Sequence, residues 1–256
     1  MWSPHPYLVG DSEGRAVLDS VRAATKLKNA GASMRFALWG HSQGGHAALF
    51  AGQLAADYAP DLELAGVAVA APATDLPKLL DDDLQSKAGK VLTAFAIWSW
   101  NKVFDAPLSP LLDAPAIAAV DRIADDCMED ILQGIVLMER EKAIDRDFIH
   151  GDLTEAEPWR TLLQRNTPDA KAAGAPLFIA QGSADPVVRP EVTRDFAEAA
   201  CRSGHSVQFL VGKGLDHMGI LSRATSSAVQ WISDRFARSP APTDCADLPR
   251  VDDGTD

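Results

Sequence analysis

The sequence predicts an α/β protein with a parallel β-sheet of about four strands and helices on both of its faces. Short apolar runs alternate with amphipathic helical segments along the chain, and several of the runs end at a glycine. This strand–helix alternation is typical of a parallel sheet that is covered by helices. With 256 residues, 46% of them hydrophobic, the chain is long enough to bury one sizeable core.

The predicted elements follow from the spacing of apolar residues. Continuous short apolar runs indicate buried strands over residues 34–39, 62–70, 176–181 and 206–211. Apolar side chains at three- and four-residue spacing indicate helices over residues 10–29, 44–58, 192–201 and 219–236.

Residues 74–175 interrupt the alternation. They contain no convincing strand and are rich in Leu and Ala, so we expect a mostly helical insertion, either a plain helical subdomain or a lid over a site. The expected core is then formed by residues 1–73 and 176–238, and an irregular acidic tail follows over residues 239–256.

Composition and charge argue against several classes of protein. Lys and Arg number 24 against 36 Asp and Glu, and the resulting formal net charge of −12 would repel phosphate backbones, so we expect no nucleic-acid partner. The longest apolar stretches, residues 66–71 and 91–100, are shorter than the ~20 residues that span a bilayer, so no transmembrane segment is expected. No cationic segment followed by an apolar run opens the chain, so it contains no signal peptide as written.

The chain has three cysteines, too few for a disulfide scaffold. Cys245 lies in the Pro- and Asp-rich tail, where it has no core to fill. We interpret it as bridged to Cys201, with two free thiols as the alternative. A bridge that closes a loop of ~45 residues would stabilise the fold by about 4 kcal/mol and would imply an oxidising compartment. Cys127 would then stay unpaired as a small core residue.

The segment Gly-His-Ser-Gln-Gly at residues 40–44 matches the pattern G-x-S-x-G. The pattern alone is weak, but it lies between a predicted strand and a predicted helix, where a nucleophile elbow belongs. We expect the turn to raise the Ser42 hydroxyl above the sheet edge, and both flanking glycines to be needed because side chains there would collide with backbone. The alternative is a glycine-rich turn with an incidental serine.

A serine hydroxyl needs a base to take its proton. His217 is the best candidate, since it follows the fourth strand and precedes the final helix, while we expect His41 and His46 to pack or form hydrogen bonds. Asp185, just past the third strand, is preferred as the orienting carboxylate over Asp216, because neighbours in a loop usually point in different directions.

The resulting order of nucleophile, acid and base is that of the α/β hydrolases. The backbone N–H of Gln43 is the expected oxyanion donor. Neither a metal nor an organic cofactor is expected. Three aromatic side chains of the insertion could line an acyl site or face lipid, although aromatic residues at helical spacing more often pack in a core: Phe95, Trp98 and Trp100.

Several segments resemble the secretory lipase family of fungi and actinobacteria. They are residues 7–24, 37–49, 56–60 and 64–72, together with the tail cysteine. The resemblance implies an α/β hydrolase with a helical cap that cleaves esters of acylglycerols or smaller esters and acts outside the cell. By position, the family's nucleophile, acid and base fall on Ser42, Asp185 and His217.

The chain departs from the family pattern at its start. Complete members carry strands before the first helix, so the four predicted strands correspond to strands 5–8, and the second oxyanion donor would lie upstream. We therefore expect the C-terminal part of the fold, with residues 35–38 as an unpaired edge strand. Two alternatives to an active ester hydrolase follow: a weak or silent homologue, and a protein that binds a partner, or itself, through this edge.

Overall fold

The computed structural model describes residues 4–125, 144 and 148–251, and it divides into two compact units. The sheet unit comprises Gly10–Asp75 and Thr167–Asp256, and the helical unit comprises Met1–Val9 and Leu76–Asn166. In the described part of the chain, no helix combines the length and the apolar character needed to cross a membrane. Cys127 lies outside the described residues.

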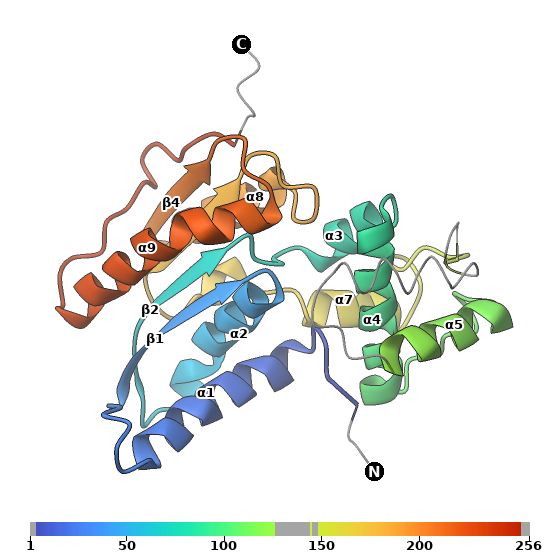
Figure 1. The fold of residues 1–256 in the computed structure, drawn as a ribbon, viewed down its shortest axis with the longest axis horizontal. Coiled ribbons are helices and arrows are strands. Elements are labelled where there is room, and N and C mark those ends of the chain that lie inside the picture. Colours follow the sequence, from blue (N-terminus) through green and yellow to red (C-terminus); the bar gives the residue numbers. More distant parts are fainter. Residues whose placement is uncertain (1–3, 126–143, 145–147, 252–256) are drawn as a thin grey trace. The chain divides into compact units, whose positions relative to one another are not determined.

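The sheet unit contains four parallel strands in the order β1-β2-β3-β4 (Figure 1). They are β1 (Arg35–His41), β2 (Glu63–Ala70), β3 (Leu177–Gly182) and β4 (Val207–Gly212). The predicted α/β fold is confirmed, and each strand lies within two residues of its predicted bounds. Every residue of β3 is buried, as is typical of a central parallel strand, whereas burial alternates along the edge strand β1.

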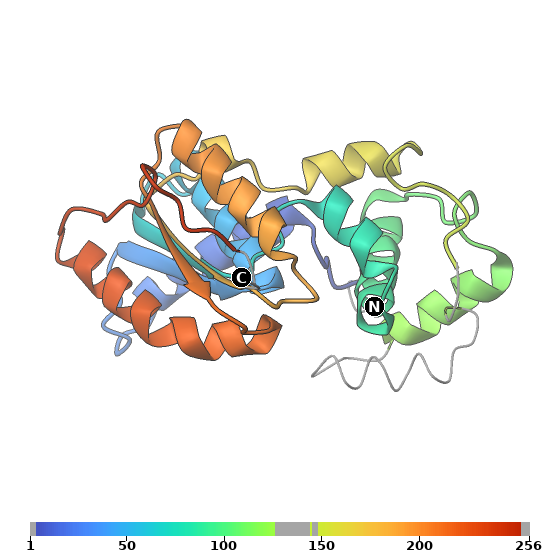
Figure 2. The same cartoon turned by 90° about the horizontal axis from the view of Figure 1, so that it is seen from above.

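Helices cover both faces of this sheet. They are α1 (Gly10–Lys26), α2 (Gln43–Tyr58), α8 (Pro190–Arg202) and α9 (His217–Phe236), with the short 3₁₀ helix η2 at Ala170–Ala172. Apolar residues of α1, α2 and α8 share one core with the strands, whereas α9 packs on the other face of the sheet (Figure 2). On that face the ring of Trp231 contacts the ring of Phe178. Both core faces are therefore closed by helices, and the carboxyl ends of the strands are left to carry a site.

The two sheet edges differ. The tail covers the β4 edge, because Asp244 N–H donates to the Val207 carbonyl at 2.7 Å and the Asp244 carboxylate accepts from Phe209 N–H at 2.7 Å. The opposite edge strand, β1, pairs with β2 alone among the strands of the described residues. The tail thus belongs to the sheet unit, and the expected open edge lies at β1.

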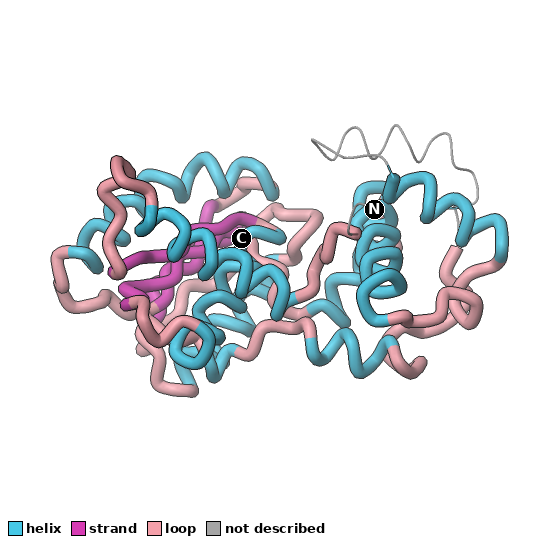
Figure 3. Tube along the Cα trace, turned by 90° about the horizontal axis from the view of Figure 1, so that it is seen from below, coloured by secondary structure: helices cyan, strands magenta, loops and turns pink. Residues whose placement is uncertain are grey.

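The helical unit contains α3 (Leu76–Asp83), α4 (Lys87–Phe104), α5 (Ala114–Asp125) and α7 (Trp159–Arg165) (Figure 3). Trp100 of α4 is fully buried against Trp159, with ring centroids 6.4 Å apart, and its Nε1–H donates to the Leu8 carbonyl at 3.3 Å. Trp100 is therefore a core residue of this unit. Residues 1–9 also belong to the helical unit, through contacts such as the Trp100–Leu8 hydrogen bond. The sequence predicted that they belong with the sheet.

Candidate active site

Ser42 occupies the turn between β1 and α2 in a conformation that ordinary residues avoid. Its backbone angles are φ 54° and ψ −120°, and its hydroxyl forms no hydrogen bond that caps α2. The backbone is held by neighbours: the Ser42 N–H donates to the Ala70 carbonyl at 3.0 Å, and the Ser42 carbonyl accepts from His46 N–H at 3.1 Å. A strained serine between a strand and a helix has the geometry of a nucleophile elbow.

Close packing around the turn requires glycine at two positions. A Cβ atom on Gly40 would lie 2.0 Å from the Gly44 carbonyl oxygen, and one on Gly45 would lie 2.8 Å from Cβ of Pro72. A Cβ on Gly44 would meet nothing within 4 Å. The prediction that both motif glycines prevent collisions is right for Gly40 and wrong for Gly44, because the crowded position in α2 is Gly45.

Asp185 and His217 form a buried pair at the carboxyl ends of β3 and β4. His217 Nδ1–H donates to Oδ2 of Asp185 at 2.8 Å, and both residues are at most 5% exposed. The other carboxylate oxygen, Oδ1, accepts from the backbone N–H groups of Val187 at 2.8 Å and Val188 at 3.0 Å. These bonds fix the carboxylate, which in turn fixes the imidazole and its tautomer.

The rival carboxylate, Asp216, has a different contact. Its Oδ1 accepts from Gly219 N–H at 2.7 Å, so it caps the N-terminus of α9. His217 is the first residue of α9, whereas the sequence placed it in the loop before that helix. The helix starts earlier than predicted because the Asp216 cap satisfies the orphan N–H groups of its first turn.

His41 connects the elbow to the loop that carries His217. Its Nε2–H donates to the His217 carbonyl oxygen at 2.8 Å, and the two ring centroids are 4.5 Å apart. Burial, and after it the neighbouring His217, lowers the pKa of His41, which keeps this ring neutral near pH 7. No hydrogen bond joins the Ser42 hydroxyl to His217 in the described part of the chain, a contact that often tightens only when substrate binds.

The first turn of α2 offers a donor for an anion. The backbone N–H of Gln43 has no intrahelical acceptor at this position, and none of the described residues accepts from it. The Gln43 side chain is held by Glu13, a residue of α1 that the sequence reasoning missed. His46, also in this turn, is fully buried and bonded to the same carboxylate.

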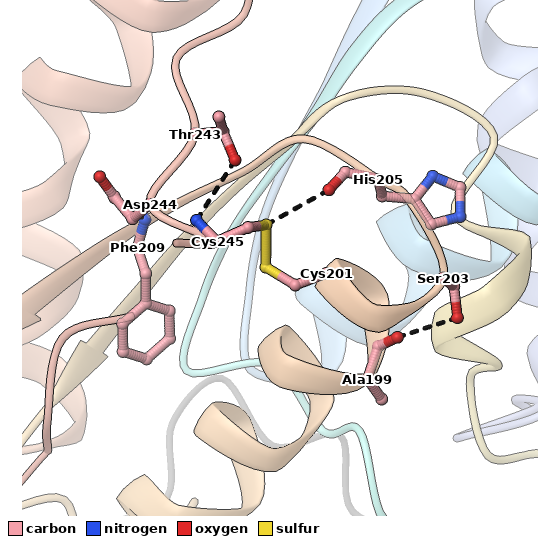
Figure 4. Close-up of a disulfide and its surroundings, with 8 residues drawn as sticks. All are labelled: Ala199, Cys201, Ser203, His205, Phe209, Thr243, Asp244 and Cys245. Atoms are coloured by element: carbon pink, nitrogen blue, oxygen red, sulfur yellow. Dashed lines mark hydrogen bonds between the residues drawn. A yellow bond between two sulfur atoms is a disulfide. The ribbon is translucent and has the colours of Figure 1, made fainter. Parts of the chain in front are cut away.

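Cys201 at the end of α8 is joined to Cys245 in the tail by a disulfide bond (Figure 4). The sulfur of Cys245 also lies 3.4 Å from the His205 carbonyl oxygen. The disulfide bond holds the tail next to β4 within the sheet unit. Among the described residues, no group of three or more His, Cys, Asp or Glu side chains could hold a metal ion.

The fold of this chain, with its serine turn between β1 and α2, is similar to that of α/β hydrolases of known structure. Its structure is similar to Candida antarctica lipase A, with a TM-score of 0.79 and 18% identity over 95% of this chain and 58% of that chain. It is also similar to the rice cell wall degrading esterase LipA from Xanthomonas oryzae, with a TM-score of 0.71 and 18% identity over 92% of this chain and 67% of that one.

The family model for secretory lipases matches residues 4–244, so the chain belongs to the secretory lipase family. It is 24% identical to Lipase 10 of Candida albicans over 93% of this chain and 54% of that protein. It is 27% identical to the trichothecene C-3 esterase of Fusarium sporotrichioides over 90% of this chain and 54% of that protein. It is 26% identical to a probable inactive lipase of Mycobacterium tuberculosis over 89% of this chain and 51% of that protein. The chain thus spans about half the length of these curated relatives.

Proposed function

We propose that this chain hydrolyses carboxylic esters, of acylglycerols or smaller alcohols, through an acyl-enzyme formed on Ser42. The observation that supports the proposal most is the Asp185–His217 pair at the ends of β3 and β4, together with the strained serine at the end of β1, whose neighbour His41 contacts His217. A serine in this conformation offers its hydroxyl, and a carboxylate-bound imidazole is the base that such a hydroxyl needs.

In the proposed acylation step, His217 Nε2 takes the proton of Ser42 as Oγ attacks the ester carbonyl carbon. The carbonyl oxygen becomes an oxyanion, which the backbone N–H of Gln43 stabilises. When the intermediate collapses, the carbon–oxygen bond to the alcohol breaks and the alkoxide takes the proton from His217. The products of this half-reaction are the free alcohol and the acyl-Ser42 ester.

Deacylation repeats the sequence with water as the nucleophile. His217 takes a proton from water, the hydroxide attacks the acyl carbon, and Ser42 leaves as its alkoxide and regains the proton from His217. The Asp185 carboxylate stabilises the imidazolium in both half-reactions and does not itself take a proton. Neither a metal nor an organic cofactor takes part in these steps.

Ester hydrolysis by Ser42→Ala tests this proposal. We expect the wild type to release p-nitrophenol from acetate, butyrate or palmitate esters with an initial burst equal to the enzyme concentration, because with these activated esters the acyl-enzyme forms faster than it is hydrolysed. Ser42→Ala should lower kcat by at least ~10³-fold, whereas Ser20→Ala, an exposed serine of α1, should not. Equal turnover by Ser42→Ala and the wild type would overturn the proposal.

We also propose that the protein acts outside the cell or in the cell envelope. The family is a secretory one, and the Cys201–Cys245 bridge is of the kind that persists in oxidising compartments. Fractionation of the source cells tests this: activity confined to the reducing cytosol would contradict it.

A second candidate function, binding through the β1 edge, is favoured by the surface beside that strand. A hollow of about 460 Å³ there is lined by Val21, Ala24, Phe36 and Phe236, and Met34 and Phe236 are each more than 40% exposed. An added strand from a second copy would pair the β1 edge and cover these side chains.

Light scattering over a range of protein concentrations tests this second candidate. We expect the wild type to self-associate and Met34→Lys to stay monomeric, because a charge at the edge opposes strand pairing. A wild type that stays monomeric at every concentration would contradict self-pairing. If the chain is a silent homologue instead, it will show no burst of p-nitrophenol.

A further inference from the structure

Glu13 is a buried carboxylate that contacts the first turn of α2 from α1. Its Oε1 accepts from the Gln43 side-chain amide at 2.6 Å, and its Oε2 accepts from His46 Nδ1–H at 2.7 Å. Glu13 is 9% exposed and His46 is 0% exposed. A charged group this deeply buried is costly unless it is hydrogen-bonded, and hydrogen bonds to a charge are about twice as strong as neutral ones.

Both donors belong to the turn that follows Ser42. Gln43 is the residue after the nucleophile, and His46 lies three positions further on, so the two bonds hold two points of one helical turn. The carboxylate therefore fixes the direction of this turn and of the backbone N–H of Gln43.

The support behind Glu13 is rigid. A Cβ on the adjacent Gly14 would lie 2.9 Å from the Phe50 carbonyl carbon and 3.0 Å from the Ala51 nitrogen, so the backbones of α1 and α2 are in direct contact there. Because α1 cannot approach α2 more closely, the carboxylate is held at a set distance from Gln43 and His46.

We propose that Glu13 is a positioning residue for the oxyanion site: it holds the first turn of α2 so that Gln43 N–H meets the oxyanion formed at Ser42. This inference rests on the proposed ester hydrolysis. The hydrogen bond to the oxyanion strengthens only in the transition state, so misplacing its donor lowers kcat and leaves KM nearly unchanged. Loss of a whole oxyanion donor costs about 10²–10³-fold, so we expect a misplaced donor to cost about 10–10²-fold.

Glu13→Gln is the informative variant. A glutamine keeps the size of the side chain but removes the charge, and its amide offers one acceptor oxygen where the carboxylate offers two, so at least one of the two contacts must weaken or change its donor. Glu13→Asp, a shorter carboxylate, tests for partial rescue.

Asp19→Asn is the matched control on the same helix. The Asp19 carboxylate accepts from the Tyr58 hydroxyl at 2.9 Å and so connects α1 to the far end of α2. The Asp19→Asn variant removes the same charge and weakens a contact between the same two helices, but it leaves the contact with the turn at Gln43 unchanged.

The experiment measures kcat and KM for p-nitrophenyl butyrate and the rate of fluorophosphonate labelling, each per folded molecule. We expect Glu13→Gln to lower kcat and the labelling rate by about 10–10²-fold with KM within about twofold, and Asp19→Asn to change neither. Equal kcat for wild type and Glu13→Gln overturns the inference and leaves the proposed function intact. If Asp19→Asn lowers kcat and the labelling rate by a similar factor, Glu13 acts only in helix packing and the inference is wrong. An inactive wild type would overturn both this inference and the proposed function.

Discussion

The Nδ1 atom of His217 lies 2.8 Å from Oδ2 of Asp185, and that carboxylate also accepts two backbone N–H groups from the residues just beyond it. The carboxylate of Asp185 is therefore held by β3 and the turn that follows it, and the imidazole of His217 by the start of α9. Two elements far apart in sequence fix one imidazole in one orientation.

Replacing Asp185 by Asn should lower kcat by about 10⁴-fold, since an amide cannot hold the required imidazole tautomer or stabilise the imidazolium. Asp216→Asn is the control, because the Asp216 carboxylate caps α9, whereas the His217 ring is bonded to Asp185. It should lower the unfolding free energy by at most about 1 kcal/mol and leave kcat near the wild-type value. If Asp216→Asn lowers kcat more than Asp185→Asn does, the carboxylate that orients His217 is Asp216.

The glycines of the elbow should respond unequally to alanine. Gly40→Ala would drive a Cβ into the Gly44 carbonyl, so we expect lost activity and a lower melting temperature. Gly44→Ala places its Cβ in open space and should leave the melting temperature unchanged or raise it, because alanine favours a helix by up to about 1 kcal/mol over glycine. The melting temperatures of both variants test this difference. An equal decrease in the two would contradict the close packing at Gly40 and the open space at Gly44.

The pH dependence of stability should report on His41. The fold lowers the pKa of this ring, chiefly by burial, while Asp185 opposes the shift. Below pH ~6.5 the His41 ring is therefore protonated more readily in the unfolded chain than in the folded one. Its contribution to the free energy of unfolding is complete above that pH and is lost as the pH falls toward the folded-state pKa.

Urea unfolding at pH 7.5 and pH 5 checks this sign. The wild type should lose more unfolding free energy on acidification than His41→Gln, whose side chain does not titrate in this range. Since all other titrating groups are common to both proteins, an equal loss in the two would show that the environment of His41 does not penalise its protonation.

The disulfide should be visible in a thiol count. The unfolded, unreduced chain should present one titratable thiol, that of Cys127, and three after reduction. Removing the bridge by Cys245→Ser should lower the unfolding free energy by up to about 4 kcal/mol, since it closes a loop with a sequence separation of 44 residues. Three thiols without reductant would contradict the bridge.

Much of this architecture could be predicted from the sequence, because its signals are local. Short apolar runs gave the four strands to within two residues, and the pattern around Ser42 located the turn between β1 and α2. The preference for Asp185 over Asp216 followed from the expectation that neighbouring residues in a loop point in different directions, so that Asp216 does not face the ring of His217.

What could not be predicted depends on contacts between distant segments. Glu13 is an ordinary acidic residue near a helix start in the sequence, and its role appears only when α1 packs on α2. The crowding that selects glycine at position 45 comes from Pro72, a residue after β2. Likewise, residues 1–9 belong to the helical unit and contact it through the Trp100–Leu8 hydrogen bond. No local sequence pattern indicates this contact.

Mass spectrometric mapping of a fluorophosphonate adduct tests the central claim most directly. We predict one adduct per chain, on the peptide that contains Ser42, and none in Ser42→Ala or in wild type unfolded before treatment. An adduct on another residue, or a cooperatively folded wild type that forms no adduct, would contradict the assignment of Ser42 as a nucleophile activated by His217.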